Sequence, residues 1–421
     1  MSARSRFGGT YVVVLMSSLI VSSIALAAIE TSRWYVRDIN RESEFIECSF
    51  NADNAFEIAL AKLNADLNWR TTHINGAFSS PITIGNASFR YRLTDSDGSL
   101  SDDDDDDCTI LVSSSVGDYT QAWEATLRPN GDPLDCLSYS LVSNKVLSLG
   151  QYGLVGSDQS VGVNDSIQTH SNAHLTGNCF VTGSTSGNVY GTVTNLAADI
   201  AIPTATALDR YIDSATEIPI TDLPLNGGQF EIKNALLSAT NNTLNGSLNS
   251  QGVYYIDCQN NDIHIFNSRL ACTLVLKDPG SNSFLYGSLH WQAEVTNYPI
   301  LLVDGEIDIA LSRSPLREAD IGVNLNPTGT PYRGTTDTTT GTIYPSALRG
   351  LIYASDTLEF SNVYGETVIQ GLVITNDQMT VNGDLLVQYR DIYFNDPPPG
   401  FTTSIGGVSI VSGSISPVPS P

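Results

Sequence analysis

The chain has 421 residues, enough for two or three domains, and 41% of them are hydrophobic, which is adequate for a packed core. It carries 20 Lys and Arg against 45 Asp and Glu, a formal net charge of −25. Such a surface repels nucleic acid and anionic lipid headgroups, so we expect no nucleic-acid partner. Abundant glycine, with 34 residues, is typical of a turn-rich β protein and argues against a helical enzyme.

The first predicted element is an uncharged apolar run from Thr10 to Ile29. Twenty residues in a helix span about 30 Å, the thickness of the hydrocarbon core of a bilayer. We therefore expect the membrane to be a partner of this segment. A secretory signal peptide is the alternative, with Ala25, Ala27 and Ala28 as its small-residue site and cleavage after Ala27 or Ala28.

The helix is predicted to continue beyond the apolar run, giving an N-terminal helical region over residues 10–72. No proline or glycine occurs between Glu30 and Arg70. Apolar residues then recur at helical spacing, which predicts one face that packs on a folded head. A kink near residue 50 is an open alternative, because Asn51 or Asp53 offers a helix cap.

A short basic leader over residues 1–9, ending in Gly8-Gly9, precedes these apolar and amphipathic helix halves. With this leader and these two helix halves, the first seventy or so residues resemble the type IV pilins and the pseudopilins of type II secretion. The resemblance implies processing at Gly8, Gly9 and Thr10, most plausibly after Gly9. Major pilins carry a glutamate five residues after the cut, whereas this chain has Val14 there, or Val13 if the cut follows Gly8.

In lacking this glutamate, the chain is similar to minor pilins of the PilX type and to the K-type pseudopilin. The resemblance implies a single-pass, membrane-anchored protein with its body outside the cytoplasm, at the cell surface or in the periplasm. It also implies other pilin-like subunits as partners and a position at the tip or start of a filament.

A small antiparallel β domain is predicted over residues 73–145, with strands at 87–93, 108–114 and 119–127. An acidic run, residues 95–107, separates the first two strands. We predict a solvated hairpin loop there, since six adjacent Asp side chains alternate in direction and cannot all converge on one ion. A calcium site is the alternative, because carboxylates are hard oxygen ligands. Its candidate ligands are Asp95, Asp97, Asp102, Asp104 and Asp106.

Residues 146–401 consist of short β-branched runs separated by Gly, Asn, Asp and Ser. This pattern favours a parallel β-helix or solenoid of about ten coils, at roughly 20–25 residues each. A β-sandwich is the alternative. Residues 312–347 are predicted to be a long loop crossing one face, and 402–421 a flexible tail. Residues 348–401 resemble the β-helical bodies that follow PilX-like N-termini. The predicted fold class is therefore mainly β, with a long N-terminal helix.

Six cysteines are present and none forms a CxxC pair, which argues against a zinc knuckle or a thioredoxin-like site. In an oxidising compartment we would test Cys108 with Cys136, and Cys258 with Cys272, as disulfides. Buried thiols are the equal alternative.

The search for catalytic or cofactor-binding patterns finds no nucleophile elbow, P-loop, Rossmann glycine pattern or HExxH. His170 and His174, near Cys179, lie in predicted strand and turn, where a spacing of four does not align two imidazoles. Asp304, Glu306 and Asp308 offer paired carboxylates at alternate positions of a predicted strand, which is a common arrangement and a weak signal for catalysis. No cofactor is predicted apart from the calcium alternative.

The sequence thus predicts a non-enzymatic, membrane-anchored, pilin-like minor subunit. It would display a large acidic β head for surface binding or for a role at the filament tip or in assembly. The alternatives are a signal-anchored extracellular β-helix enzyme that acts on glycans, and a plain surface adhesin.

Overall fold

The computed structural model describes residues 8–66, 68–95, 98–101, 107–117, 119–204, 206–361, 365–403, 407–411 and 413–419. The chain forms two compact units, which we describe separately. Unit 1 consists of Met1–Asn130 with Ile405–Pro421, and unit 2 consists of Gly131–Ser404.

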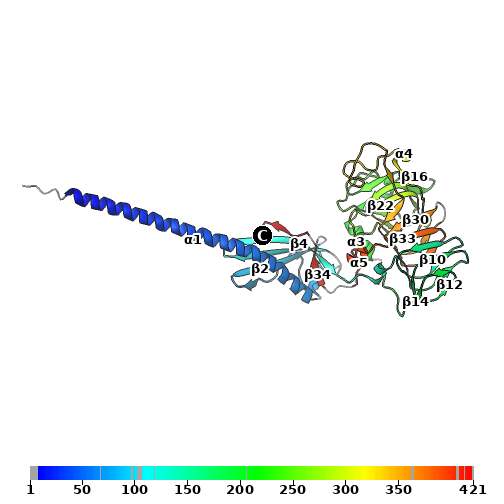
Figure 1. The fold of residues 1–421 in the computed structure, drawn as a ribbon, viewed down its shortest axis with the longest axis horizontal. Coiled ribbons are helices and arrows are strands. Elements are labelled where there is room, and N and C mark those ends of the chain that lie inside the picture. Colours follow the sequence, from blue (N-terminus) through cyan, green and yellow to red (C-terminus); the bar gives the residue numbers. More distant parts are fainter. Residues whose placement is uncertain are drawn as a thin grey trace, which may run out of the picture. The chain divides into compact units, whose positions relative to one another are not determined.

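Unit 1 begins with the helix α1, Gly8–Ala65, which is continuous over 58 residues (Figure 1). At 1.5 Å per residue its length is about 87 Å. The helix therefore runs without a break near residue 50, where a kink was the alternative. A one-turn helix, α2 (Trp69–Thr72), follows.

The last turns of α1 pack on an antiparallel sheet. Buried residues Ala55, Phe56, Ala59 and Leu63 recur at helical spacing and contact the apolar side of the sheet. The strands are β1 (Ile82–Ile84), β2 (Ala87–Thr94), β3 (Cys108–Val116), β4 (Tyr119–Asn130), β34 (Gly407–Ile410) and β35 (Ser416–Val418). Adjacent strands from β1 to β4 are antiparallel, and β34 and β35 both pair with β4.

Two sequence-based boundaries differ from the structure. The chain end, predicted as a flexible tail over 402–421, supplies β34 and β35, because Val408 fills the same core as α1. The small β unit ends at Asn130 instead of residue 145, since Leu141–Ser143 pairs in parallel with strands of unit 2. Unit 2 is therefore inserted between β4 and β34 of unit 1.

Unit 2 is a parallel β-helix, so the predicted fold class is confirmed. Within the residues described, its strands stack in three columns, which we call the first, second and third walls in the order in which each coil passes them. The first wall is a ten-stranded sheet. In stacking order it contains β15 (Thr216–Glu217), β19 (Val253–Asp257), β21 (Thr273–Lys277), β23 (Leu301–Asp304), β28 (Leu351–Ala354), β31 (Leu372–Thr375), β5 (Leu141–Ser143), β8 (Val161–Val163), β11 (Cys179–Val181) and β14 (Val193–Asn195).

The second and third walls share two long strands that bend at a corner. These are β20 (Ile263–Ala271) and β22 (Phe284–Gln292), with a register shift between Phe266 and Ser268. The second wall adds β16 (Leu225–Asn226), β17 (Gln229–Lys233), β24 (Ile307–Leu311), β29 (Leu358–Phe360), β32 (Met379–Val381), β6 (Leu147–Leu149), β9 (Ile167–Thr169) and β12 (Thr185–Ser186). The third adds β18 (Leu236–Ser238), β27 (Ala347–Arg349), β30 (Glu366–Gln370), β33 (Asp384–Gln388), β7 (Leu154–Ser157), β10 (His174–Thr176) and β13 (Val189–Tyr190).

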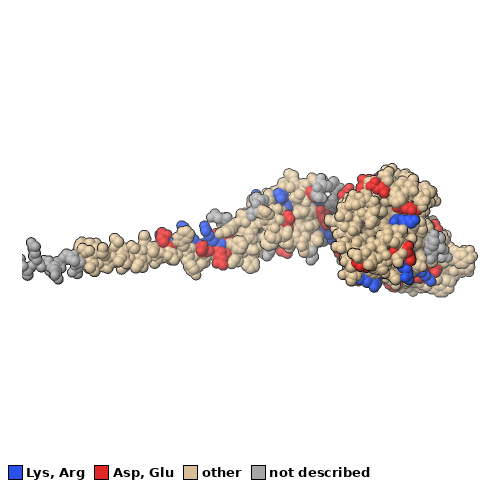
Figure 2. All heavy atoms as spheres, turned by 90° about the horizontal axis from the view of Figure 1, so that it is seen from above, with Lys and Arg blue, Asp and Glu red and all other residues tan. Residues whose placement is uncertain are grey.

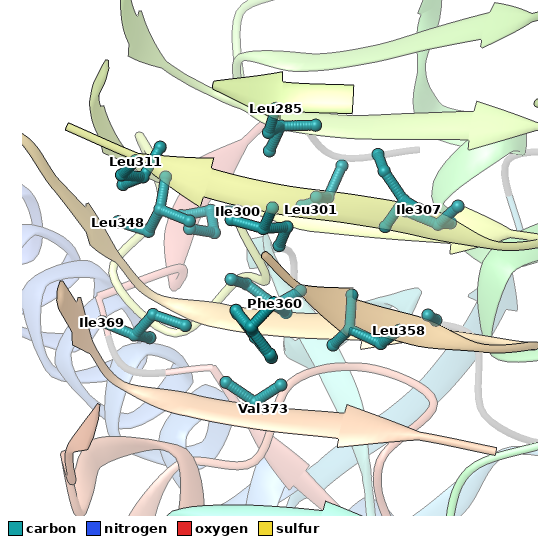
Figure 3. Packing of buried hydrophobic residues seen from close by; sticks show 14 of the residues in the cluster. Leu285, Ile300, Leu301, Ile307, Leu311, Leu348, Leu358, Phe360, Ile369 and Val373 are labelled. Carbon is teal, nitrogen blue, oxygen red and sulfur yellow. The ribbon is translucent and has the colours of Figure 1, made fainter. Parts of the chain in front are cut away.

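Aliphatic side chains from all three walls meet inside the coil and form one continuous core (Figure 3). In the close-up, Leu301 comes from the first wall, Leu358 from the second and Leu348 from the third, and all are fully buried. Each short strand turns alternate residues inward, as its period of two requires. Burying these residues from successive coils in one core is what stabilises strands of only two to five residues.

The coils do not stack in the order of the sequence. Coils from β5 to β14 occupy one end of the stack, and the chain then returns to β15 at the opposite end. From there the coils come back toward the middle, where β31, β32 and β33 pair with β5, β6 and β7. This seam joins the first and last coils of unit 2.

Further segments connect the strands or cover the walls. The first wall is covered by α3 (Thr206–Ser214) and α5 (Ile392–Asn395), together with the 3-10 turn η1 (Asp135–Ser138). Its middle strands are therefore buried on both sides, whereas β14 at one end is exposed. A second 3-10 turn is η2 (Ile220–Asp222). Residues 312–346 form an excursion that we call the strap; it contains β25 (Leu316–Arg317), α4 (Glu318–Ile321) and β26 (Ile343–Tyr344).

Candidate functional site

The predicted processing residues Gly8, Gly9 and Thr10 are the first three residues of α1. From Tyr11 to Ser43 every residue of the helix is exposed. In the described part of the chain, α1 is the one helix long and apolar enough to span a membrane. Figure 2 shows no charged atoms on the helix next to the grey N-terminal residues. An apolar helix surface of this length needs a nonaqueous environment or a protein partner.

Beyond the uncharged run, α1 still exposes large apolar side chains. Trp34, Tyr35, Ile39 and Phe45 are each about half exposed or more. The helix first contacts the sheet at Phe45, whose ring lies 6.4 Å from that of Tyr119, and then at Cys48, whose Sγ donates to the carbonyl oxygen of Ser114 at 3.2 Å. The stretch from the end of the uncharged run to Ser43 therefore offers an apolar surface that is exposed within unit 1.

The acidic run is only partly described. Asp97, Asp102, Asp104 and Asp106 lie outside the described residues. Asp95 is buried at the end of β2, where its carboxylate pairs with Arg70 at 3.6 Å. At the other end of the run, Asp107 pairs with Arg128 at 3.2 Å, and both side chains are about one third exposed. A calcium site remains a prediction, and calcium titration with thermal melting is the measurement for it.

The cysteines all lie in the described part of the chain, and each is buried without a disulfide bond. Cys108 is not bonded to Cys136 in this structure, and Cys258 is not bonded to Cys272. All four are buried free thiols, which was the alternative. Burial raises the pKa of Cys179 to about 11 and that of Cys258 to about 12. Protonated, enclosed thiols are poor nucleophiles and poor metal ligands.

The histidine and carboxylate candidates are not brought together. Among the described residues, no group of three or more His, Cys, Asp or Glu is placed to hold a metal ion. His174 packs its ring against Tyr190 at 5.2 Å on the third wall, whereas Cys179 lies in the core of the first wall. Asp304 and Asp308 lie on different walls, in β23 and β24, and accept hydrogen bonds from Ser355 and Ser361 respectively. Burial raises the pKa of Asp308.

A buried polar cluster beneath the strap was missed by sequence reasoning. Arg269 of β20 is almost fully buried and donates to the carbonyl oxygens of Leu325, Thr330 and Pro331 at 2.5, 2.9 and 2.8 Å. Its guanidinium lies 5.6 and 5.5 Å from the ring centroids of Tyr332 and Tyr344. No local motif marks this cluster, because its members come from strands and an excursion far apart in sequence.

Glu318 organises the strap from within. The fully buried carboxylate accepts from the backbone N–H of Leu325 at 2.7 Å and of Thr342 at 2.9 Å, and from the Tyr344 hydroxyl at 2.7 Å. Burial, and then this contact with Glu318, raise the pKa of the Tyr344 phenol. These bonds close the strap on itself while Arg269 holds it to the wall.

A corner motif was also missed, although the sequence does carry a signal for it. Asn164 Nδ2 donates to Asn144 Oδ1 at 2.9 Å, and Asn144 Nδ2 donates to Asn376 Oδ1 at 3.0 Å. This amide ladder crosses the seam between the first and last coils. Each asparagine directly follows a first-wall strand, and the first two are 20 residues apart, one coil length.

Comparisons with known proteins give little guidance. No protein-family model matches the sequence, and no curated protein matches it at a significant level. Among solved structures, the competence-associated pilin ComZ from Thermus thermophilus is similar over 89% of this chain and 98% of that one, with 11% identity and a TM-score of 0.25. A likeness at that level establishes neither the fold nor the function of this chain.

Proposed function

We propose that this protein is a non-enzymatic, membrane-anchored, pilin-like minor subunit that displays an acidic β-helix outside the cytoplasm. Its body would serve in surface binding or at the tip or start of a filament. Its lipid-facing segment would be Thr10 to Ile29, and its other partners would be the helices of similar subunits.

The observation that carries this proposal is the two-part exposure of α1. Its uncharged part suits lipid by length and composition. The following part, with Trp34 and Phe45, is too polar for lipid yet exposes apolar side chains that would pack against other helices. Only its C-terminal part, from Phe45 onward, packs on the sheet of unit 1.

The absence of a glutamate at Val14 supports a terminal position in the filament. In the pilins that this chain resembles, that glutamate is the partner of the N-terminal amine of a neighbouring subunit. A subunit without it would lose one inter-subunit contact, which suits the first subunit assembled. The net charge of −25 makes a polyanionic ligand for the body unfavourable.

The mature N-terminus is the decisive measurement. The protein would be purified from the membranes of its own host, and its first residues read by N-terminal sequencing. We expect Thr10 as the first residue, or Gly9 if the cut follows Gly8. A mature chain that begins after Ala27 or Ala28 would instead identify a secreted protein without an anchor, and would contradict the proposal, as would an unprocessed chain.

A matched pair of variants separates the two kinds of processing. Replacing Gly8 and Gly9 with valine is expected to block cleavage and leave a protein larger by the leader. Replacing Ala27 and Ala28 with valine is expected to have no effect on cleavage. The opposite pattern would support the signal-peptide alternative.

A further inference from the structure

The strap lies on the outer side of the third wall over an apolar cluster of its own. Leu316, Leu325 and Tyr344 from the strap pack with Leu236 of β18. This cluster is separate from the core inside the coil. A segment held by a satellite cluster can open while the main core remains folded.

Most of the polar bonds between strap and wall are made by a few side chains. Arg269 makes three of them, and Thr330 Oγ1 lies 2.9 Å from the hydroxyl of Ser238 and accepts from Asn241 Nδ2 at 2.6 Å. Thr240 Oγ1 also donates to the carbonyl oxygen of Gly329 at 2.6 Å, and Ser288 Oγ to that of Ser314 at 2.8 Å. At the start of the strap, Arg313 pairs with Glu366 and Asp384 of the third wall at 3.6 Å each, partly in solvent. A buried contact is made by His290 of β22. Its Nδ1 lies 3.0 Å from the carbonyl oxygen of Pro345, which requires the proton of the neutral ring to be on Nδ1.

The surroundings of His290 have no place for a second proton. The side chain is fully buried, and its Nε2 has no hydrogen-bond partner. Its ring contacts Tyr332 at 5.3 Å and Tyr344 at 5.5 Å between centroids. A proton on Nε2 would create a buried ionic donor without an acceptor, which is costly.

The nearby charges make that proton still less favourable. Arg269 from β20, Arg349 from β27 and Arg333 from the strap all oppose a positive charge on His290. The carboxylate of Glu318, on the strap, is already engaged by two backbone N–H groups and the Tyr344 hydroxyl. The site is therefore a cationic, enclosed position in a strongly acidic protein.

We propose that the strap is an acid-released cover: protonation of His290 detaches residues 312–346 from the third wall while the β-helix core stays folded. Release would expose the outer side of β18, β20 and β22. The closed state favours the neutral imidazole of His290. In the open state, water solvates both the neutral and the protonated imidazole.

The direction of the effect follows from the two states of the histidine. In the closed state, burial lowers the pKa of His290 to about 4, against an ordinary value near 6.5 in an open strap. A group whose pKa is lowered in the closed state contributes its full stability above the higher value, and loses it as the pH falls toward the lower one. Between the two, each pH unit shifts the equilibrium about tenfold toward the open form.

The test is hydrogen exchange of the full chain in a nonionic detergent, read by mass spectrometry between pH 7 and pH 4. Exchange times are scaled to hold the chemical exchange rate constant. We expect peptides from residues 318–345 to lose protection as the pH falls from 6.5 to 4. Peptides covering β23, β28 and β31 should stay protected over the same range.

Two variants remove the titrating group while keeping one of its contacts. His290→Asn retains an N–H donor toward Pro345, and His290→Phe retains a ring between the two tyrosines. In each, strap protection should become independent of pH relative to the core. The matched control is His264→Asn, a half-buried histidine of the second wall that contacts Asn282, which should behave as the wild type.

The proposal fails if the wild-type strap stays protected down to pH 4, or if strap and core lose protection together. It also fails if the strap opens over the same pH range in a folded His290 variant. Loss confined to the strap in the wild type supports it even where one variant does not fold.

Discussion

Two ion pairs of unit 1 show how burial decides what a charge contributes. Asp95 and Arg70 have side chains that are 2% and 5% exposed, and Asp107 and Arg128 are 34% and 30% exposed. Removing one partner of a buried pair leaves a charge in a poorly solvated place, whereas water replaces the lost partner near the surface.

We therefore expect Asp95→Asn to lower the free energy of unfolding of unit 1 by about 3–5 kcal/mol, since the buried guanidinium of Arg70 loses the charge of this carboxylate. The matched change Asp107→Asn should cost about 1 kcal/mol or less. Urea unfolding followed by the fluorescence of Trp69, which packs against Arg70, measures both. Equal costs for the two variants would show that burial does not separate these pairs.

The cysteines allow a direct test of the remaining disulfide predictions. All six are enclosed, and burial raises the pKa of Cys136, Cys179, Cys258 and Cys272. We expect no alkylation by iodoacetamide at pH 8 in the folded protein, and six alkylated thiols after unfolding without reductant. Four labelled thiols would instead mean that one pair, such as Cys258 with Cys272, is bonded in the purified protein.

At the scale of elements, the corners of the β-helix are as constrained as its core. Gly371 precedes β31, and Gly350 precedes β28 on the neighbouring coil. A Cβ at Gly371 would lie 1.9 Å from the carbonyl oxygen of Gly350. The backbones of the two coils approach so closely here that no side chain fits between them.

Gly371→Ala should accordingly lower the free energy of unfolding of unit 2 by about 3 kcal/mol, because one coil must move away from the next. Gly341→Ala, in the strap, is the control. Its nearest neighbour would be 3.7 Å away, so the change should stay within about 0.5 kcal/mol. Chemical denaturation of both variants gives the comparison, and an unaffected Gly371→Ala protein would refute the close approach.

For the whole molecule, the main finding is that unit 2 is an insertion with adjacent ends. The backbone N–H of Thr403 donates to the carbonyl oxygen of Asp132 at 2.8 Å, and Pro133 forms a bridge with Thr402. On the side of unit 1, Gly407 pairs with Asn130. Each unit also has a core of its own.

Each unit should therefore fold without the other. Replacing residues 131–406 with Asn-Gly would join β4 to β34 by a two-residue hairpin turn, and we expect this shortened protein to keep a cooperative unfolding transition in detergent. Residues 131–404 expressed alone should give the β-rich circular dichroism spectrum of a folded solenoid. Loss of structure in both pieces would show that the units depend on each other.

The sequence by itself determined the elements whose cause is local. An uncharged run without glycine or proline specifies the helix from Thr10 onward, and strands such as Ala87–Thr94 carry their own alternation of buried and exposed residues. Short β-branched runs with Gly and Asn between them specified a β-helix of about ten coils, which matches the ten strands of its first wall.

Only the tertiary structure decided which coil lies next to which. Runs such as Leu141–Ser143 and Leu372–Thr375 have the same kind of apolar pattern as the other first-wall strands. Their pairing across the seam therefore cannot be predicted from either segment alone. The same holds for Val408 in the core of unit 1, and for Arg269, His290 and Glu318 beneath the strap. The physical reason is that periodicity fixes which side of a strand is buried, whereas the neighbour that buries it is chosen by the packing of the whole chain.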